Sequence, residues 1–105
     1  MAQLQNVTGE PILNKVEQLS GQITVATAGT AVQGPDVALK GGAYVKAMGA
    51  NGGKVYVGND GLDDVTTLNG YELAAGEVSI WRVDNMNKLW FDAATSGDKF
   101  CWMKA

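Results

Sequence analysis

The residue types needed for common catalytic chemistry are scarce in this chain. It contains one cysteine, Cys101, and no histidine. Cys101 lies between two aromatic residues in the run Lys99–Met103, a setting typical of a small buried apolar side chain. A catalytic thiolate needs an activating neighbour, and histidine is the usual one; zinc sites and serine hydrolases depend on the same imidazole. We therefore expect no enzymatic activity, no metal and no cofactor.

A glycine-rich segment before a lysine resembles a phosphate-binding loop. It runs from Gly49 to Val55. That motif needs a glycine where Met48 stands and a serine or threonine where Val55 stands, and it must open a helix whose N-terminal amides face the anion. A strand pattern follows here instead, so the segment predicts a hairpin loop.

Three acidic residues, Asp60, Asp63 and Asp64, cluster around Gly61. Carboxylates can ligate calcium, but the helix-loop-helix calcium site needs acids at alternate positions and a glutamate at the twelfth. The spacing does not match. We favour a solvated acidic loop, and a weak calcium site remains the alternative.

Composition limits the classes of partner. The chain has 105 residues, a net charge of −3, 46% hydrophobic and 18% charged residues, and 14 glycines. This length suits one domain with a thin core, and the glycines indicate many tight turns. An acidic chain with eight scattered cations is a poor match for nucleic acid. No apolar run approaches the ~18 residues of a membrane span, so we expect no membrane partner.

Residues 1–20 differ from the rest and predict an N-terminal arm or short helix. Ile12, Leu13, Val16 and Leu19 have the spacing of one helical stripe. A helix of about ten residues is marginal alone in water, so it needs a surface to pack on. Either the segment lies across its own domain, or it docks on a neighbouring subunit or a larger assembly.

From residue 21 to 105 the pattern changes to short alternating strands. Alternation of apolar and polar residues indicates half-buried strands, and glycine with neighbouring asparagine or aspartate indicates the turns between them. The clearest strands are 22–27, 54–58, 77–81 and 89–93, and weaker ones are 30–33, 37–40, 43–48, 71–73 and 99–103. Eight or nine short strands predict an all-β, antiparallel, jelly-roll-like β-sandwich as a single domain.

The alternation also suggests where three aromatic residues point. If Val78 and Ile80 face the core, Trp81 falls on the opposite face, and Tyr56 and Trp90 have the same outward parity in their strands. Monomers rarely expose an apolar patch of that kind. We favour a subunit interface; the alternatives are a platform for stacking a sugar, or strands buried on both faces.

The order of the motifs resembles small structural proteins of tailed bacteriophages. These share an opening ITV…AGTAVQ strand pair, a central hairpin of the form NxGxVYVG, a GYxLxxGE turn and a closing NxxLxxDA…GD…W segment. In this chain the elements fall at Ile23–Gln33, Asn51–Gly58, Gly70–Glu77 and Asn87–Trp102. About four-fifths of the chain is covered, and the first twenty residues lie outside it.

This resemblance implies a capsid decoration (cement) protein with a β-sandwich or jelly-roll fold. Such proteins commonly form trimers on the outer surface of the shell and clamp neighbouring capsomers. The expected partners are copies of the chain itself and the major capsid protein. The expected location is the virion, after synthesis in the bacterial cytoplasm. No catalytic residues are carried over. The alternative function is a carbohydrate-binding or host-recognition module of a head fibre or tail, with Tyr56, Trp81 and Trp90 as its stacking surface.

Overall fold

The computed structural model describes residues 18–61, 65–66 and 69–105. Within this part of the chain, eight strands and one short 3₁₀ helix follow one another. The elements are β1 (Ser20–Thr24), β2 (Val32–Gln33), β3 (Ala43–Ala47), β4 (Val55–Gly58), β5 (Tyr71–Leu73), β6 (Val78–Trp81), η1 (Met86–Lys88), β7 (Trp90–Ala93) and β8 (Lys99–Lys104). The weak candidate 37–40 forms only an isolated bridge between Ala38 and Asn85.

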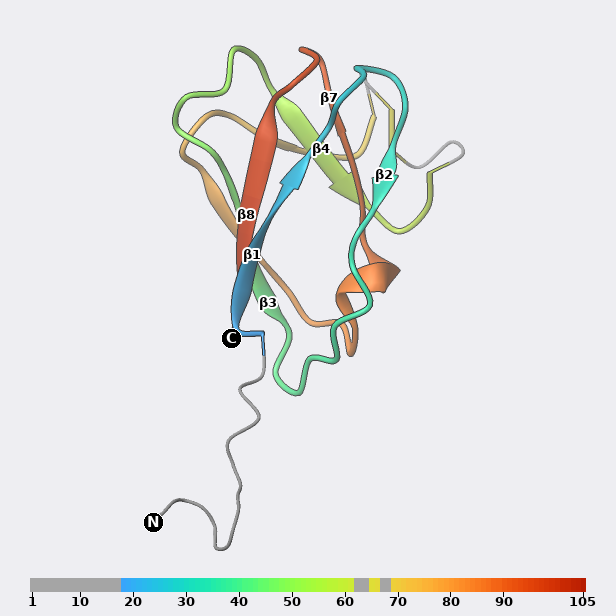
Figure 1. Cartoon of the computed structure of the whole chain (residues 1–105), viewed down its shortest axis with the longest axis vertical. Helices are drawn as coiled ribbons and strands as arrows, with labels where there is room; N and C mark the ends of the chain where they lie inside the picture. The colour runs from blue at the N-terminus through green and yellow to red at the C-terminus, as the bar shows by residue number, and fades with distance from the viewer. Residues whose placement is uncertain (1–17, 62–64, 67–68) are drawn as a thin grey trace, which may run out of the picture.

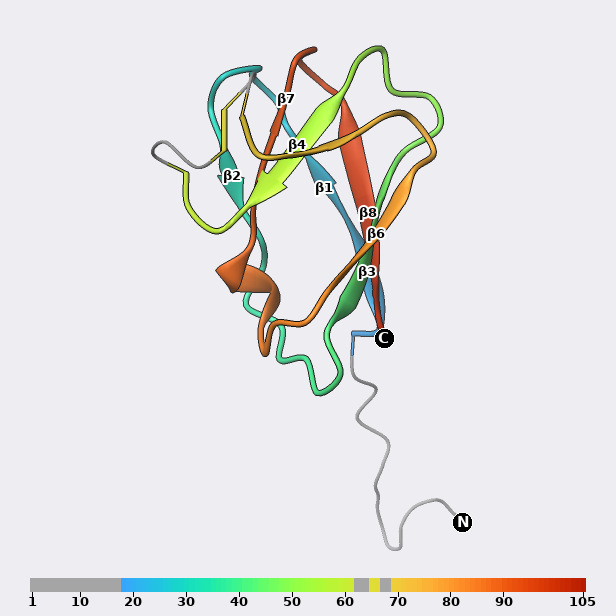
Figure 2. The same cartoon turned by 180° about the vertical axis from the view of Figure 1, so that it is seen from behind.

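The strands form two antiparallel four-stranded sheets packed together. Sheet A has the order β1-β8-β3-β6, and sheet B has the order β2-β7-β4-β5. Strands β1 and β8, β2 and β7, β3 and β6, and β4 and β5 are paired, as in a long antiparallel ribbon wound into two layers. This is the jelly-roll arrangement of eight strands. It confirms the predicted all-β sandwich, whose layers can be followed in Figure 1 and from behind in Figure 2.

The core lies between the sheets and is built by alternation along each strand. In β3, Ala43, Val45 and Ala47 are buried while the two residues between them are exposed. Side chains from β7 and β8 meet across the layers, where the rings of Phe91 and Phe100 lie 4.7 Å apart between centroids at 63°. Edge-on aromatic contacts of this kind are favourable in addition to the area they bury.

The predicted orientation of β6 is wrong. Val78 and Ile80 are exposed, whereas Trp81 packs partly buried against the core. The cause is register: Ser79 lies opposite Val45, and Trp81 lies opposite Ala43, in the β3–β6 pair. Residues opposite each other in an antiparallel pair share a face, so the pairing with inward-facing β3 residues turns Trp81 inward.

Of the predicted N-terminal arm, residues 1–20, the structure describes residues 18–20. The predicted positions Ile12, Leu13 and Val16 lie outside the described residues. Leu19 is described: it is exposed, and its carbonyl accepts a hydrogen bond from the Lys104 backbone N–H at 2.8 Å, which extends the β1–β8 ladder. Among the described residues, no helix has the length and apolar character needed to cross a membrane.

Candidate interaction surface

The outer face of sheet A brings apolar side chains from three strands together. Because successive side chains alternate between faces, the residues between the core positions project outward. The register then sets them in two rows across the sheet, Ser20–Met103–Tyr44–Ile80 and Gln22–Cys101–Lys46–Val78. We call these eight residues the sheet A face.

Four members of this face are large, apolar and solvent-exposed. The exposed fractions are 57% for Val78, 53% for Met103, 44% for Ile80 and 40% for Tyr44. Scattered single apolar residues are normal on a protein surface, but neighbouring ones on one flat sheet form a patch. The sheet A face is therefore the candidate interaction surface of the described part of the molecule.

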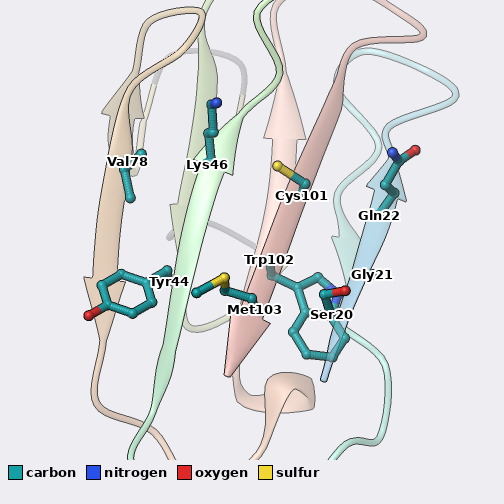
Figure 3. A pocket seen from close by; sticks show the side chains of 9 residues that line it. All are labelled: Ser20, Gly21, Gln22, Tyr44, Lys46, Val78, Cys101, Trp102 and Met103. Atoms are coloured by element: carbon teal, nitrogen blue, oxygen red, sulfur yellow. The ribbon is translucent and has the colours of Figure 1, made fainter. Parts of the chain in front are cut away.

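A groove of about 580 Å³ runs along this surface. Figure 3 shows its lining, with Met103 and Tyr44 as neighbours and the Trp102 indole beside Gly21. A Cβ on Gly21 would lie 2.9 Å from Trp102 Nε1, so the missing side chain makes room for the indole. The lining residues are Ser20, Gly21, Gln22, Tyr44, Lys46, Val78, Cys101, Trp102 and Met103.

Lys46 is the one charged residue in the groove lining. It makes no ion pair within the described part of the chain. The groove therefore combines an apolar floor with a single positive charge, which suits an apolar segment that carries a carboxylate.

Two ion pairs lie away from the groove. Lys54 Nζ is 2.7 Å from Glu72 Oε2, and Lys88 Nζ is 2.9 Å from Asp84 Oδ1. The hydrogen bond to Glu72, then its charge, raises the pKa of Lys54 above its ordinary value. The hydrogen bond from Lys88, then its charge, lowers the pKa of Asp84 below its ordinary value. Both pairs are exposed, so each is a minor contribution to stability.

The glycine-rich segment is a loop, but the predicted hairpin is wrong, because this loop joins β3 of sheet A to β4 of sheet B and the two strands are not paired. Its amides bind a carboxylate of the protein. The backbone N–H of Gly52 donates to Asp98 Oδ1 at 2.9 Å, and that of Gly53 donates to Asp98 Oδ2 at 3.0 Å. The Asn51 side chain pairs with the backbone of Lys99 in both directions, each bond 2.8 Å long. These donors are used within the protein, so they do not form an anion cradle.

Of the three acidic residues clustered around Gly61, the structure describes Asp60. Asp60 is half-buried and has an interaction partner, while Asp63 and Asp64 lie outside the described residues. Among residues 18–61, 65–66 and 69–105, no three cysteine or acidic side chains are grouped to hold a metal ion.

The three predicted aromatic residues do not share one exposed face. Tyr56 and Trp90 lie on the outer side of sheet B, whereas Trp81 belongs to sheet A and points inward. Tyr56 is only 8% exposed, and Trp90 is half-buried because the chain at Gly61 lies against its ring. In sheet B, β4 and the neighbouring part of β7 are covered on both faces, which was one of the alternatives drawn from the sequence.

Asp92 is a further buried group on the outer side of sheet B, 1% exposed. Its Oδ1 accepts hydrogen bonds from the backbone N–H groups of Gly29 at 3.0 Å and Ala93 at 2.8 Å. Its Oδ2 has no hydrogen-bond partner within the described structure. The contact with Gly29 ties the β1–β2 connection over this sheet.

A second, more open hollow of about 540 Å³ lies beside Trp81. Its lining includes Asn59, Asn69 and the exposed ring of Tyr71, which meets Trp81 edge-on with centroids 5.8 Å apart. The sequence reasoning missed Tyr71 as a surface aromatic and missed the members of the sheet A face. The alternation in Ala43–Ala47 was the available signal, because it places Tyr44 outward.

No protein-family model, curated protein or solved structure matches this chain. Its functional interpretation therefore rests on its own residues and geometry.

Proposed function

We propose that this chain is a non-enzymatic structural subunit of a tailed-phage virion that decorates and stabilises the capsid as a symmetric trimer. Its partners are copies of itself and the major capsid protein, and it acts on the capsid surface after synthesis in the bacterial cytoplasm. The motif resemblance and the jelly-roll fold support this proposal.

The sheet A face is the observation that carries the proposal. Val78, Ile80, Tyr44 and Met103 leave an apolar sheet surface in water, and burying it against a protein partner is favourable. Several modest interfaces repeated by symmetry then give strong attachment to a repetitive shell. A catalytic role finds less support, because the glycine-loop amides and both oxygens of Asp98 are engaged with each other.

The self-association part is tested by sedimentation velocity of the full chain over a micromolar concentration series. The wild type should form oligomers, and Val78→Lys should weaken their association at least about tenfold because it places a charge in the apolar contact. Tyr71→Lys is the matched control, since Tyr71 is 58% exposed but lies in sheet B.

The capsid part is tested by co-sedimentation with empty capsids of the phage that encodes the chain. Wild type should pellet with the capsids, and Val78→Lys should pellet less. A chain that stays monomeric at every concentration and does not bind capsids would overturn the proposal.

Carbohydrate binding remains the second candidate, on a different site from the one the sequence suggested. The hollow beside Trp81 combines the exposed Tyr71 ring with Asn59 and Asn69, a set able to stack on a sugar and bond its hydroxyls. Glycan-array binding by the wild type that is lost in Tyr71→Ala would favour this function, and its absence would remove it.

A further inference from the structure

The lining of the groove on sheet A defines the chemistry of an occupant that would fit it. Its floor is apolar, and Lys46 supplies one positive charge without an ion-pair partner in the described chain. A fitting occupant presents two or three apolar side chains on one side and a carboxylate at the edge. A sugar or a nucleotide would leave most of this floor without a matching contact.

A second copy of the same face fits this requirement poorly. Two sheet A faces packed together would bring two Lys46 side chains into one apolar contact, and like charges out of water repel strongly. Neither face supplies a carboxylate to the other, because no acidic residue lines the groove.

The N-terminal segment of the chain has the required chemistry. Ile12, Leu13 and Val16 share one helical stripe, and Glu17 follows Leu13 by four positions, so it flanks that stripe. The stripe matches the apolar floor, and the Glu17 carboxylate matches Lys46. The segment is also followed closely by the groove lining, because Ser20, the first residue of β1, is one of the lining residues.

The direction of β1 decides which copy of the segment can fill the groove. The Leu19 carbonyl accepts a hydrogen bond from the Lys104 N–H, which continues the β1–β8 pairing by one residue before Ser20. The chain therefore enters β1 along the direction of the strand and does not cross the sheet at this point. Val78 lies on β6, three strands from β1, or about 14 Å at the usual strand spacing.

A segment that folded back onto its own face would have to reverse before it crossed the sheet. Val16 is four residues before Ser20, a distance of at most about 14 Å when fully extended. Because the reversal shortens that reach, Val16 of the same chain cannot lie over Val78, whereas Val16 of a neighbouring copy has no such limit.

We propose that the groove of each subunit receives residues 12–17 of a neighbouring copy, with Glu17 beside Lys46. This inference rests on the proposed self-association and names its contact. The exchange joins each copy to the next by a contact between two different surfaces, which closes into a ring under rotational symmetry.

Cys101 provides the test because it lines the groove and is the only cysteine of the chain. A full chain carrying Val16→Cys and Cys101→Ser is mixed with an excess of the wild type and oxidised mildly. A disulfide between the two kinds of chain can form only between copies. Asn14→Cys in the same Cys101→Ser background is the matched control, because position 14 lies on the opposite side of the stripe.

We expect the Val16→Cys chain to link to the wild type at least about tenfold faster than the Asn14→Cys chain. Mass spectrometry should identify the linked peptides as position 16 with Cys101. Equal rates for the two variants would overturn the inference. So would an intramolecular disulfide between position 16 and Cys101 in a chain that carries Val16→Cys and keeps Cys101, because it would put the segment on its own groove.

Sedimentation of the same samples separates this inference from the proposed function. Oligomers without the expected crosslink would support self-association but would exclude the binding of residues 12–17 in the groove of a neighbouring copy. In a second readout, Leu13→Ser/Val16→Ser should raise the rate at which maleimide labels Cys101 several-fold, while Gln5→Ser/Asn14→Ser leaves it unchanged. Equal labelling in all three chains would also count against the inference.

Discussion

Replacing Asp98 with alanine should destabilise the protein strongly, because this carboxylate organises the β3–β4 loop. Asp98 is 6% exposed and accepts backbone hydrogen bonds from Gly52 and Gly53 at 2.9 and 3.0 Å. A hydrogen bond to a charged group contributes about 1.5–3 kcal/mol. The two donors lie in a partly solvated loop, so water recovers part of the loss in Asp98→Ala. We expect the free energy of unfolding to fall by about 2–4 kcal/mol.

Urea denaturation followed by tryptophan fluorescence measures this change. For a domain of this size it corresponds to a fall in Tm of roughly 10–25 °C. Asp98→Asn should lose about half as much, since its amide keeps one oxygen acceptor. A loss below about 1 kcal/mol in Asp98→Ala would show that the loop holds its shape without the carboxylate, and would refute the reasoning.

Two further changes test the turns and the surface charges. Gly42 has φ +88° and a Cβ there would lie 2.2 Å from the Trp81 carbonyl oxygen, whereas Gly76 has φ +86° and open space around it. Gly42→Ala should therefore cost more than Gly76→Ala, which carries only the backbone penalty of about 1–2 kcal/mol; equal losses in urea denaturation would contradict the steric argument. Lys88→Met should raise the pKa of Asp84 toward its ordinary value, measured by NMR titration of the carboxyl carbon. Because the folded-state pKa of Asp84 is lowered, this pair stabilises the fold above the unfolded-state pKa, and its contribution is lost as pH falls through the lowered value; an unchanged titration in Lys88→Met would exclude the pair as the cause.

The fold class could be predicted because its signals are local. Alternation along 54–58 and 89–93 and the glycine-containing turns are visible within a few residues, and the structure has strands at both places. The loop at Gly49–Val55 follows from the same kind of signal, but its type does not: the predicted hairpin is wrong because the strands on either side of it pair in different sheets. Departures from a motif, such as Met48 and Val55 in the apparent phosphate loop, were also readable from the sequence.

The orientation of β6 could not be predicted, because the sequence around it permits both faces. Val78 and Ile80 alternate with Ser79 and Trp81, so each pair can supply an apolar face. A shift of one residue in register exchanges the two faces completely. The choice is made by pairing with Ala43 and Val45, more than thirty residues earlier in the chain.

The sheet A face was missed for a related reason. Each strand contributes only one or two of its apolar side chains, which alone look like ordinary surface residues. They become a patch when β8 pairs with β1 and β3, segments separated by more than fifty residues. Sequence periodicity describes one strand at a time, and the patch is a property of the sheet.

The two sheets differ in how their outer faces are covered, and this difference supports the proposed assembly surface. On sheet B, the backbone N–H of Gly29 donates to Asp92 and the chain at Gly61 lies against Trp90, so these two described residues cover part of this side. On sheet A, Met103 and Val78 remain exposed in the described structure. A jelly roll needs its inner faces for the core, and the outer face of sheet B is already covered at β4 and β7. This difference supports the sheet A face as the proposed partner surface, and residues 12–17 have the apolar and acidic side chains that the proposed contact needs.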